Sequence, residues 1–590
     1  MILNALVDYY ERIANDPDQE GVAQYGFSEQ KVSFCVVLQA DGSLHAIQDE
    51  RIEIGKKRTP RACLVPGQAK PTGSGLNPCF LWDNAQYLLG FKPDDPNPGR
   101  TAEAFEKFRT RHFELESEID DGGFRAVCAF LRRWDPAGVT SHPDLAEITG
   151  HFGVFRLVGS NGYVHDSRPI LDYWKNRHCQ PISDIIAPSL IDGTVGPIAR
   201  IHEPKIKGVS GAQSSGATIV SFNQDAFESY GLTQSHNAPV GEVDAFRYCN
   251  ALNRLLADRG VRIGDATVVW WSDAPTPMET FFGAAFDDKS AEDEETKQRI
   301  GAFLNRLRRG TVGDDLGNLD QPFYVLGLSP NASRLSVRFW LAGSVGQFAE
   351  RLGQHLQDLE IIGDDVQGPP LTIRRMVLET APPKSGWPDA DRVSPVLSGE
   401  IARAILVGSP YPRSLLAGVL RRVRAEGFAD REKRKDWLAA THRRAAIIKA
   451  SLIREARHAG QNKELPVSLN KDHPSTAYQL GRLFAALEKA QEDALPGIKA
   501  TVKDRYFGSA SSTPSAVFPR LIRLNQHHMG KLESGWRINR EKNIGQIMDK
   551  IDTFPAHLPV EDQGLFALGY YHQRQDFFTS TKPEPQEATT

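Results

Sequence analysis

The chain has few cysteines, and none of them are paired in sequence. Its 590 residues contain six cysteines and no CxxC motif. A zinc ribbon or a dithiol redox centre needs such pairs, so the sequence argues against both. We expect free, mostly buried thiols in a reducing compartment. The six residues are Cys35, Cys63, Cys79, Cys128, Cys179 and Cys249.

The sequence also lacks a long apolar run and a secretory signal. No window reaches 18 uninterrupted apolar residues, and the opening MILNALVDYYERIAND carries acids where a signal would have a basic start. With 40% hydrophobic and 24% charged residues, the composition is that of an ordinary globular protein. We therefore expect a cytoplasmic protein with no membrane partner, built from about three to five structural units.

Signatures of common catalytic sites are missing as well. No GxxxxGK[ST], strand-linked GxGxxG, HExxH or GxSxG motif occurs. The dipeptide His165-Asp166 is similar to the centre of an HD metal-phosphohydrolase motif, but that chemistry needs at least two more histidines and another carboxylate. We predict no catalytic residue, no metal site and no cofactor, with an HD-type metal-dependent nuclease as the alternative.

Charge is distributed unevenly, although the net charge of the chain is only −4. Residues 401–590 contain 30 basic and 20 acidic side chains, a net charge of +10, which leaves −14 for residues 1–400. Residues 401–460 hold 14 of these basic side chains and only 5 acidic ones. A polyanion responds to such local charge within a Debye length of about 8 to 10 Å. The two parts of the chain therefore meet different electrostatic demands.

The hydrophobic pattern predicts an α+β protein. A mixed α/β N-terminal region is followed by an all-helical C-terminal region that ends in a four-helix bundle. Short β-rich runs predict strands at 31–39, 217–222, 266–271 and 333–340.

Helical periodicity takes over after about residue 345. The four bundle helices are predicted around 475–495, 517–528, 532–551 and 558–578. Ser475 or Thr476 is available as the N-cap of the first. We expect three domains, namely residues 1–345, a basic helical region at 346–466 and the bundle at 467–590.

Two glycine-rich loops of the N-terminal region carry short polar donors. Glycines let the backbone approach a ligand closely, while lysine and amide side chains can contact phosphates and base edges. Plain surface loops are the alternative. The loop residues that could contact a polyanion are Gln68, Lys70, Ser74, Asn77, Lys205, Lys207, Ser210, Gln213 and Ser214.

The stretch 413–457 predicts two helices with arginines among regularly spaced apolar residues. Such a pair can bury one side and offer the other to phosphates without sequence specificity. A solvated amphipathic hairpin is the equal alternative. The candidates for contacting a nucleic-acid backbone are Arg421, Arg422, Arg424, Arg443, Arg444, Lys449 and Arg454.

Several sequence blocks, in their order along the chain, resemble one family. The blocks are ILNALVDYYERI, NPCFLWDNAQYLLG, GVSGAQSSGATIVSFNQDAFESYG, LSPNASRLSVRFW, SPYPRSLLAGVLRRVRA, RRAAIIKASLIR, QLGRLFAALEKAQ and FALGYYHQR. Together they resemble the large subunit of the type I-C CRISPR surveillance complex (Cascade), the c-type member of the Cas-eight group. The resemblance covers essentially the whole chain.

The resemblance implies a non-enzymatic role in RNA-guided defence. CRISPR RNA would read the target by base pairing, while the large subunit recognises the short protospacer-adjacent motif in double-stranded DNA and promotes duplex opening and R-loop formation. With this role implied, we predict that the candidate residues of the two glycine-rich loops read the motif. It would also stabilise the displaced single strand and help recruit a helicase-nuclease. Further implied partners are the backbone, RNA-end-capping and small subunits, with the RNA-end and backbone contacts in residues 1–345. A free-standing DNA-binding regulator is the second alternative.

The family resemblance also implies that the C-terminal bundle exists as a separate small subunit, produced by internal translation of the same gene. Val467 lies in a polar stretch just before the first predicted bundle helix, and valine codons can serve as bacterial starts. A simple loop residue is the alternative interpretation of Val467.

Overall fold

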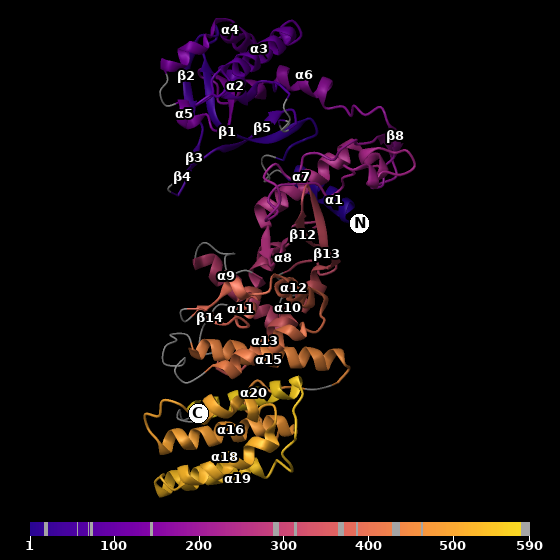
Figure 1. The fold of residues 1–590 in the computed structure, drawn as a ribbon. Coiled ribbons are helices and arrows are strands. Elements are labelled where there is room, and N and C mark those ends of the chain that lie inside the picture. The colour runs from indigo at the N-terminus through magenta and orange to yellow at the C-terminus, as the bar shows by residue number, and fades with distance from the viewer. Residues whose placement is uncertain are drawn as a thin grey trace, which may run out of the picture. The chain divides into compact units, whose positions relative to one another are not determined.

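The structure, a computed structural model, divides into two compact units. The first comprises Met1–Asp258 and Pro330–Ser336, and the second comprises Arg259–Ser329 and Val337–Thr590. This division differs from the boundaries at residues 345 and 466 expected from the sequence. The elements are labelled in Figure 1. The described residues are 1–16, 22–55, 57–68, 70, 75–141, 145–286, 294–311, 316–363, 371–384, 387–426, 437–461 and 464–579.

A five-stranded sheet forms the centre of the first unit. Its strand order is β2-β1-β7-β6, and β5 also pairs with β1. The β1–β7 pair is parallel, and the other pairs are antiparallel. The predicted strand at 31–39 is confirmed as part of β1. The bounds are β1 Phe27–Leu38, β2 Leu44–Asp49, β5 Arg61–Pro66, β6 Trp82–Asn84 and β7 Phe152–Leu157.

Both faces of β1 are buried, as its nearly continuous apolar sequence requires. Phe34, Val36 and Leu38 face one core, whereas Cys35 and Val37 face another. Successive side chains of a strand point to opposite faces, so a strand covered on both sides needs apolar residues at every position. The helices of this unit are α1 Ile2–Ala14, α2 Ala85–Leu88, α3 Pro98–Leu115, α4 Gly122–Arg133, α5 Leu145–Ile148, α6 Arg168–His178 and α7 Glu242–Arg259.

The predicted strand at 217–222 is wrong. Only Ala217 and Thr218 make β-bridges, to Ile206 and Arg334 respectively. The β-rich composition of this segment finds no neighbouring strand along its length, so no ladder forms. Two small hairpins complete the unit: β3 (Ile52–Ile54) with β4 (Lys57–Thr59), and β8 (Ile186–Pro188) with β9 (Val195–Pro197).

The second unit begins with a four-stranded sheet of order β10-β11-β12-β13. The predicted strands at 266–271 and 333–340 are confirmed within β11 and β13. The strands are β10 Val261–Ile263, β11 Ala266–Ser272, β12 Pro322–Asn331 and β13 Arg334–Ser344. The helices around them are α8 Pro277–Phe281, α9 Glu294–Arg309, α10 Val345–Asp358, α11 Ile373–Leu378 and α12 Pro395–Val407. A short hairpin of β14 (Pro383–Lys384) and β15 (Trp387–Pro388) interrupts the region expected to be purely helical.

The C-terminal part is helical, and all four predicted bundle helices are confirmed. Ser475 caps the first as expected, because its side chain accepts from the backbone N–H of Tyr478. Between them lies a further helix, α17, so residues 464–579 contain five helices. The elements are α13 Arg413–Ala425, α15 Trp437–His458, α16 Thr476–Ala494, α17 Val502–Ala510, α18 Pro514–Met529, α19 Ser534–Met548 and α20 Val560–Thr579.

Two glycines allow α16 and α20 to touch backbone to backbone. A Cβ at Gly481 would lie 2.0 Å from the carbonyl oxygen of Phe566, and one at Gly569 would lie 2.2 Å from that of Tyr478. Helix α20 also packs against α13 and α15, as Figure 1 shows. One hydrophobic core consequently extends from Ile263 to Tyr571 through the second unit.

Candidate nucleic-acid interface

The loop at residues 205–217 is a closed turn with an ordered backbone. Ile206 and Ala217 pair through N–H···O bonds of 2.8 and 2.9 Å, which brings the two ends of the loop together. Both side chains are buried. Gly216 has φ +93°, and a Cβ there would lie 2.7 Å from the Cβ of Lys205, so the turn requires glycine at this position.

A side chain of helix α7 fixes the start of this loop. Asn253 accepts from the backbone N–H of Lys207 at 2.8 Å and donates to the carbonyl of Lys205 at 3.1 Å. No sequence signal singles out Asn253, because its partners are backbone atoms 46 and 48 residues away. The loop geometry is thus set before any ligand binds, which lowers the entropy cost of binding.

The loop directs its polar side chains to solvent. The five predicted motif-reading residues of this loop are all exposed: Lys205, Lys207, Ser210, Gln213 and Ser214. Three of them are uncharged donors able to bond base edges, and the two lysines carry the positive charge that a phosphate attracts. The structure therefore brings these candidates together on one short, anchored turn.

The segment after the loop packs on the turn between β12 and β13. Thr218 donates to the carbonyl of Ser333 at 3.2 Å and accepts from the N–H of Leu335 at 2.8 Å. The guanidinium of Arg334 lies 4.5 Å from the ring centroid of Phe227. All of these residues belong to the first unit.

The other predicted loop, at residues 67–77, is only partly consistent with a binding role. Gln68 and Asn77 are exposed, and Ser74 lies outside the described residues. Lys70 forms an ion pair with the buried carboxylate of Asp83, and its Nζ lies 3.4 Å from the ring centroid of Tyr87. Lys70 is therefore engaged within the fold, which corrects its expected position as an open phosphate contact.

The expected basic face of the helix pair α13 and α15 is largely absent. Arg444 is 2% exposed, and its guanidinium donates to Glu379 at 2.8 Å and to Glu426 at 2.9 Å. Arg443 donates to the same Glu379 at 2.7 Å. A guanidinium enclosed by two carboxylates stabilises the helix packing and has no surface for a phosphate.

A second buried cluster surrounds Asp358 at the end of α10. Arg454 is 2% exposed and donates to Asp358 and to the carbonyls of Ala404 and Ser409. Lys449 is also 2% exposed and donates to the Asp358 carbonyl at 3.0 Å, and burial lowers the pKa of its ammonium. The expectation that these two residues face solvent is wrong, because apolar neighbours and backbone acceptors enclose them.

The remaining backbone candidates lie on α13. Arg424 donates to the side chain of Gln563 on α20 and is half-buried. Arg422 is half-buried, whereas Arg421 is exposed. Arg421 is thus the predicted residue of this region that is best placed for a phosphate.

The His165-Asp166 pair is built into the fold. His165 is 1% exposed, its Nε2 lies 3.1 Å from the carbonyl oxygen of Leu64, and burial lowers the pKa of its ring. Asp166 accepts from the N–H of Tyr163 at 2.8 Å, forming a local cap. Among the described residues, no group of three or more His, Cys, Asp or Glu side chains is placed to hold a metal ion.

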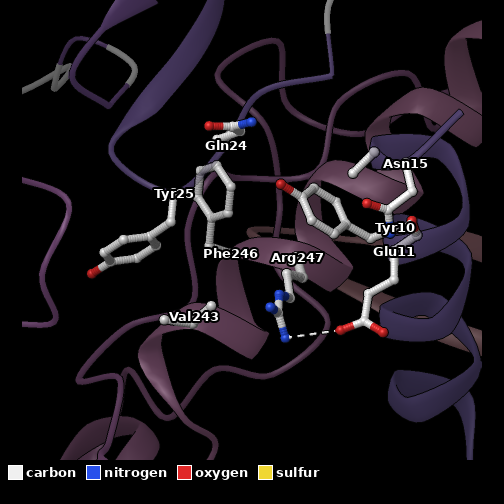
Figure 2. Close-up of a pocket in the computed structure, with 9 residues that line it drawn as sticks. Tyr10, Glu11, Asn15, Gln24, Tyr25, Val243, Phe246 and Arg247 are labelled. Carbon is white, nitrogen blue, oxygen red and sulfur yellow. Dashed lines mark hydrogen bonds and ion pairs between the residues drawn. The ribbon is translucent and has the colours of Figure 1, made fainter. Parts of the chain in front are cut away.

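A pocket of about 440 Å³ lies between α1, the segment before β1, and α7. Figure 2 shows Phe246 between the rings of Tyr10 and Tyr25. The guanidinium of Arg247 donates to Glu11 at 3.2 Å, and the hydroxyl of Tyr25 donates to Glu242 at 2.9 Å. Arg247 and Tyr25 are therefore each paired with a carboxylate of the same unit.

Comparison with known proteins identifies the family. A family model described as CRISPR-associated protein (Cas_Csd1) matches residues 6–578, nearly the whole chain. No curated protein matches the chain. In the part that the structure describes, no helix is long and apolar enough to span a bilayer. The family match confirms the resemblance to the large subunit of the type I-C surveillance complex, and the chain therefore belongs to the Cas_Csd1 family of CRISPR-associated proteins.

Proposed function

We propose that this chain recognises a short motif in double-stranded DNA as the large subunit of an RNA-guided type I-C complex. The observation that carries the proposal is the loop at 205–217, whose backbone is fixed and whose polar side chains are open to solvent. Family membership supplies the setting. In such systems protein contacts read a short duplex motif, and the guide RNA reads the rest by base pairing.

Each exposed residue of the loop has a role in this proposal. Gln213, Ser210 and Ser214 bond base edges, because amide and hydroxyl groups can match their donors and acceptors. Lys205 and Lys207 hold the flanking phosphates. From the other loop, the exposed Gln68 and Asn77 add base contacts. Lys70 is not included, because Asp83 and Tyr87 occupy its ammonium.

The wider role follows from the family. The proposed subunit acts in the cytoplasm without catalysing a reaction, promotes duplex opening and R-loop formation, and assembles with CRISPR RNA and with the backbone, RNA-end-capping and small subunits. It also helps to recruit a helicase-nuclease. Arg421, and in part Arg422, hold the backbone of the displaced strand, since Arg421 is exposed on α13.

The direct test measures duplex binding by the assembled complex. Gln213→Ala, Ser214→Ala and Asn77→Ala are each compared with wild type on duplexes with and without the motif. Each lost base contact should weaken motif-dependent binding by about 5- to 150-fold, the equivalent of roughly 1 to 3 kcal/mol. Binding to the duplex without the motif should change little, because these side chains carry no charge.

Gln180→Ala provides the matched control. Gln180 is an exposed glutamine of the same unit outside both loops, so its loss should leave binding unchanged. Equal motif discrimination in all variants would refute the assignment. Purification of the chain from cells as a DNA-binding oligomer without RNA or partner subunits would instead favour a free-standing regulator.

A further inference from the structure

Residues 229–232 form a tight turn with Tyr230 at its tip. Tyr230 has φ +54° and Gly231 has φ +71°. The N–H of Leu232 donates to the carbonyl of Ser229 at 2.9 Å. Positive φ at both central residues together with this bond defines a type I′ turn.

Tyrosine is an unusual residue for the first central position of such a turn. Type I′ turns favour asparagine, aspartate or glycine there, because a bulky side chain with positive φ is sterically strained. Strain of this kind persists where the surrounding structure enforces it, and it is often retained for function. The turn therefore keeps an aromatic residue where asparagine would fit better.

The side chain of Asn237 enforces the conformation. Its Oδ1 accepts from the N–H of Ser229 at 2.9 Å and from the Ser229 hydroxyl at 3.3 Å. Its Nδ2 donates to the carbonyls of Leu232 at 2.7 Å and Gln234 at 2.9 Å. Four hydrogen bonds from one amide thus hold the turn, and none of them involves the Tyr230 side chain.

The ring of Tyr230 gains nothing from packing within the chain. Tyr230 is 100% exposed, the highest value among the large apolar and aromatic residues that the structure describes as exposed. Of its neighbours in sequence, Ser229, Gly231 and Thr233 are exposed as well, and Leu232 is 44% exposed. An isolated ring with mostly small and polar sequence neighbours is a poor protein hot spot, because such anchors sit within well-packed surroundings that exclude water.

The turn and the 205–217 loop are joined through one scaffold. Phe227, three residues before Tyr230, lies under the guanidinium of Arg334. Arg334 forms a β-bridge with Thr218, the residue that directly follows the loop. All of these residues belong to the first unit. The ring therefore projects from the same framework as the proposed motif-reading side chains.

We propose that Tyr230 is a stacking platform for an unpaired nucleobase. Every base has a π-face, so a rigidly presented aromatic ring can bind one without reading its sequence. The Asn237 clamp fixes the backbone under the ring, which reduces the ordering cost of stacking. The inference rests on the proposed function, and the base belongs either to an opened DNA strand or to the guide RNA.

Photocrosslinking in the assembled complex tests this inference. 5-Iodouracil is placed beside the motif of a target duplex in one arm and at successive positions of the guide RNA in the other. A crosslink mapped to Tyr230 in either arm supports the proposal and identifies the strand. The absence of a Tyr230 crosslink in both arms, when wild type binds the target duplex, overturns it.

Variants test the energetic role of the ring. Tyr230→Asn should preserve the turn, because asparagine favours this conformation, yet weaken binding by about 5- to 150-fold, the range of one lost base stack. Tyr230→Phe should bind within about twofold of wild type. An abasic site at the crosslinked position should make wild type and Tyr230→Asn bind equally. Ile182→Asn, which alters an 84% exposed apolar side chain of the same unit, should have no effect.

The outcomes separate this inference from the proposed function. Equal binding by wild type and Tyr230→Asn, with motif discrimination intact, overturns the stacking role alone. A Tyr230→Asn variant that binds nucleic acid normally but fails to join the protein subunits also overturns it, because the ring then docks on protein. Wild-type complex that binds no motif-containing duplex refutes the proposed function, and the stacking inference falls with it.

Discussion

Glu379 neutralises two arginines of α15 at the same time. Its two carboxylate oxygens accept from Arg443 at 2.7 Å and from Arg444 at 2.8 Å, and the carboxylate is almost fully buried. Glu426 completes the enclosure of Arg444 at 2.9 Å. Because the interior solvates an unpaired charge poorly, the stability of this helix pair depends on all the partners being present.

We predict that Glu379→Gln destabilises the second unit strongly. The change leaves two arginines with one fewer carboxylate in a buried site, and breaking such a pair typically costs about 3 to 5 kcal/mol. Chemical denaturation of the full chain, followed by circular dichroism, measures the loss.

Glu561→Gln is the control for this prediction. Glu561 is 44% exposed and lies 4.0 Å from Arg413, which is 81% exposed. Solvent screens a pair of this kind, so its loss should cost less than about 1 kcal/mol. Similar decreases in the free energy of unfolding for Glu379→Gln and Glu561→Gln would contradict the prediction that burial makes the Glu379 pairs more important for stability.

His112 makes the first unit sensitive to acid. It is fully buried, its Nδ1 lies 2.7 Å from the carbonyl oxygen of Phe108, and its Nε2 accepts from the N–H of Leu81 at 3.0 Å. A proton on Nε2 would remove the acceptor for Leu81. Desolvation by burial lowers the pKa of the ring from the usual 6.5 to about 3.

We predict that stability falls as the pH is lowered from about 6.5 toward 3. In this window the unfolded chain protonates His112 while the folded chain does not, so the unfolded state binds more protons and acid favours it. The free energy of unfolding falls by about 1.4 kcal/mol per pH unit in this window. Above pH 6.5, His112 contributes no pH dependence. Denaturation as a function of pH should show a smaller slope for His112→Phe. An NMR titration in which His112 protonates near pH 6.5 in the folded chain would contradict the prediction.

At the residue scale, the sequence pattern located helices but did not separate exposed from buried arginines. Arg421 and Arg444 both lie on helices with apolar residues at helical spacing, yet one is exposed and the other is 2% exposed. The partners that bury Arg444 are 18 and 65 residues away in the chain. Such pairings depend on tertiary packing, which periodicity does not encode.

At the scale of single elements, the 205–217 loop is held by helix α7 through Asn253. Its Oδ1 accepts from the backbone N–H of Lys207, and its Nδ2 donates to the carbonyl of Lys205. Asn250 lies one helical turn earlier, but its Nδ2 donates at 2.9 Å to the carbonyl of Phe246 in its own helix. Both asparagines therefore lie on α7, but Asn253 bonds the loop backbone whereas Asn250 bonds its own helix.

We predict that Asn253→Ala weakens motif-dependent DNA binding by about tenfold without contacting DNA. Without these two hydrogen bonds the loop backbone is no longer fixed before binding. Ordering it on binding then costs about 1 to 2 kcal/mol for one residue. Competition binding by the assembled complex measures the change. Asn250→Ala should bind like wild type, and equal binding by the two variants would show that the loop does not need this anchor.

Where local sequence signals predicted an element correctly, they coincide with local physics. Strand β1 is buried on both faces and therefore needs the continuous apolar run from which it was predicted. Ser475 caps α16, as its position just before the helix suggested. Helix α17 was missed because it has nine residues and contains Gly508 and Ser509, which weaken the helical signal. The close contact of Gly481 and Gly569 with the facing backbones was also invisible, since it arises between two helices.

At the scale of the whole molecule, the C-terminal helices share their core with the helices that precede them. Helix α20 packs on α13 and α15, where a Cβ at Gly564 would lie 3.2 Å from a Leu452 methyl carbon. The hydroxyl of Tyr571 donates to the carbonyl of Ile362 at 2.8 Å, and the N–H of Ile362 donates to the carbonyl of Val467 at 2.8 Å. The boundary expected at residue 467 therefore crosses a packed interface rather than an open linker.

This interface determines what an internally started fragment would be. Translation from Val467 would yield a fragment of 124 residues that retains α16 to α20. The close backbone contacts at Gly481 and at Gly569 would keep α16 and α20 together. The face of α20 that packs on α13 and α15 would lose its cover, and an uncovered apolar face favours association.

We predict that the unaltered gene, expressed with a C-terminal tag, produces a second band near the mass of this fragment. A synonymous change of the Val467 codon that removes its use as a start should abolish the band and leave the full-length chain unchanged. The purified fragment should elute as an oligomer or together with partner subunits, because α20 needs a replacement for α13 and α15. A single full-length band would contradict the internal start, and a stable monomeric fragment would show that α20 does not depend on those helices.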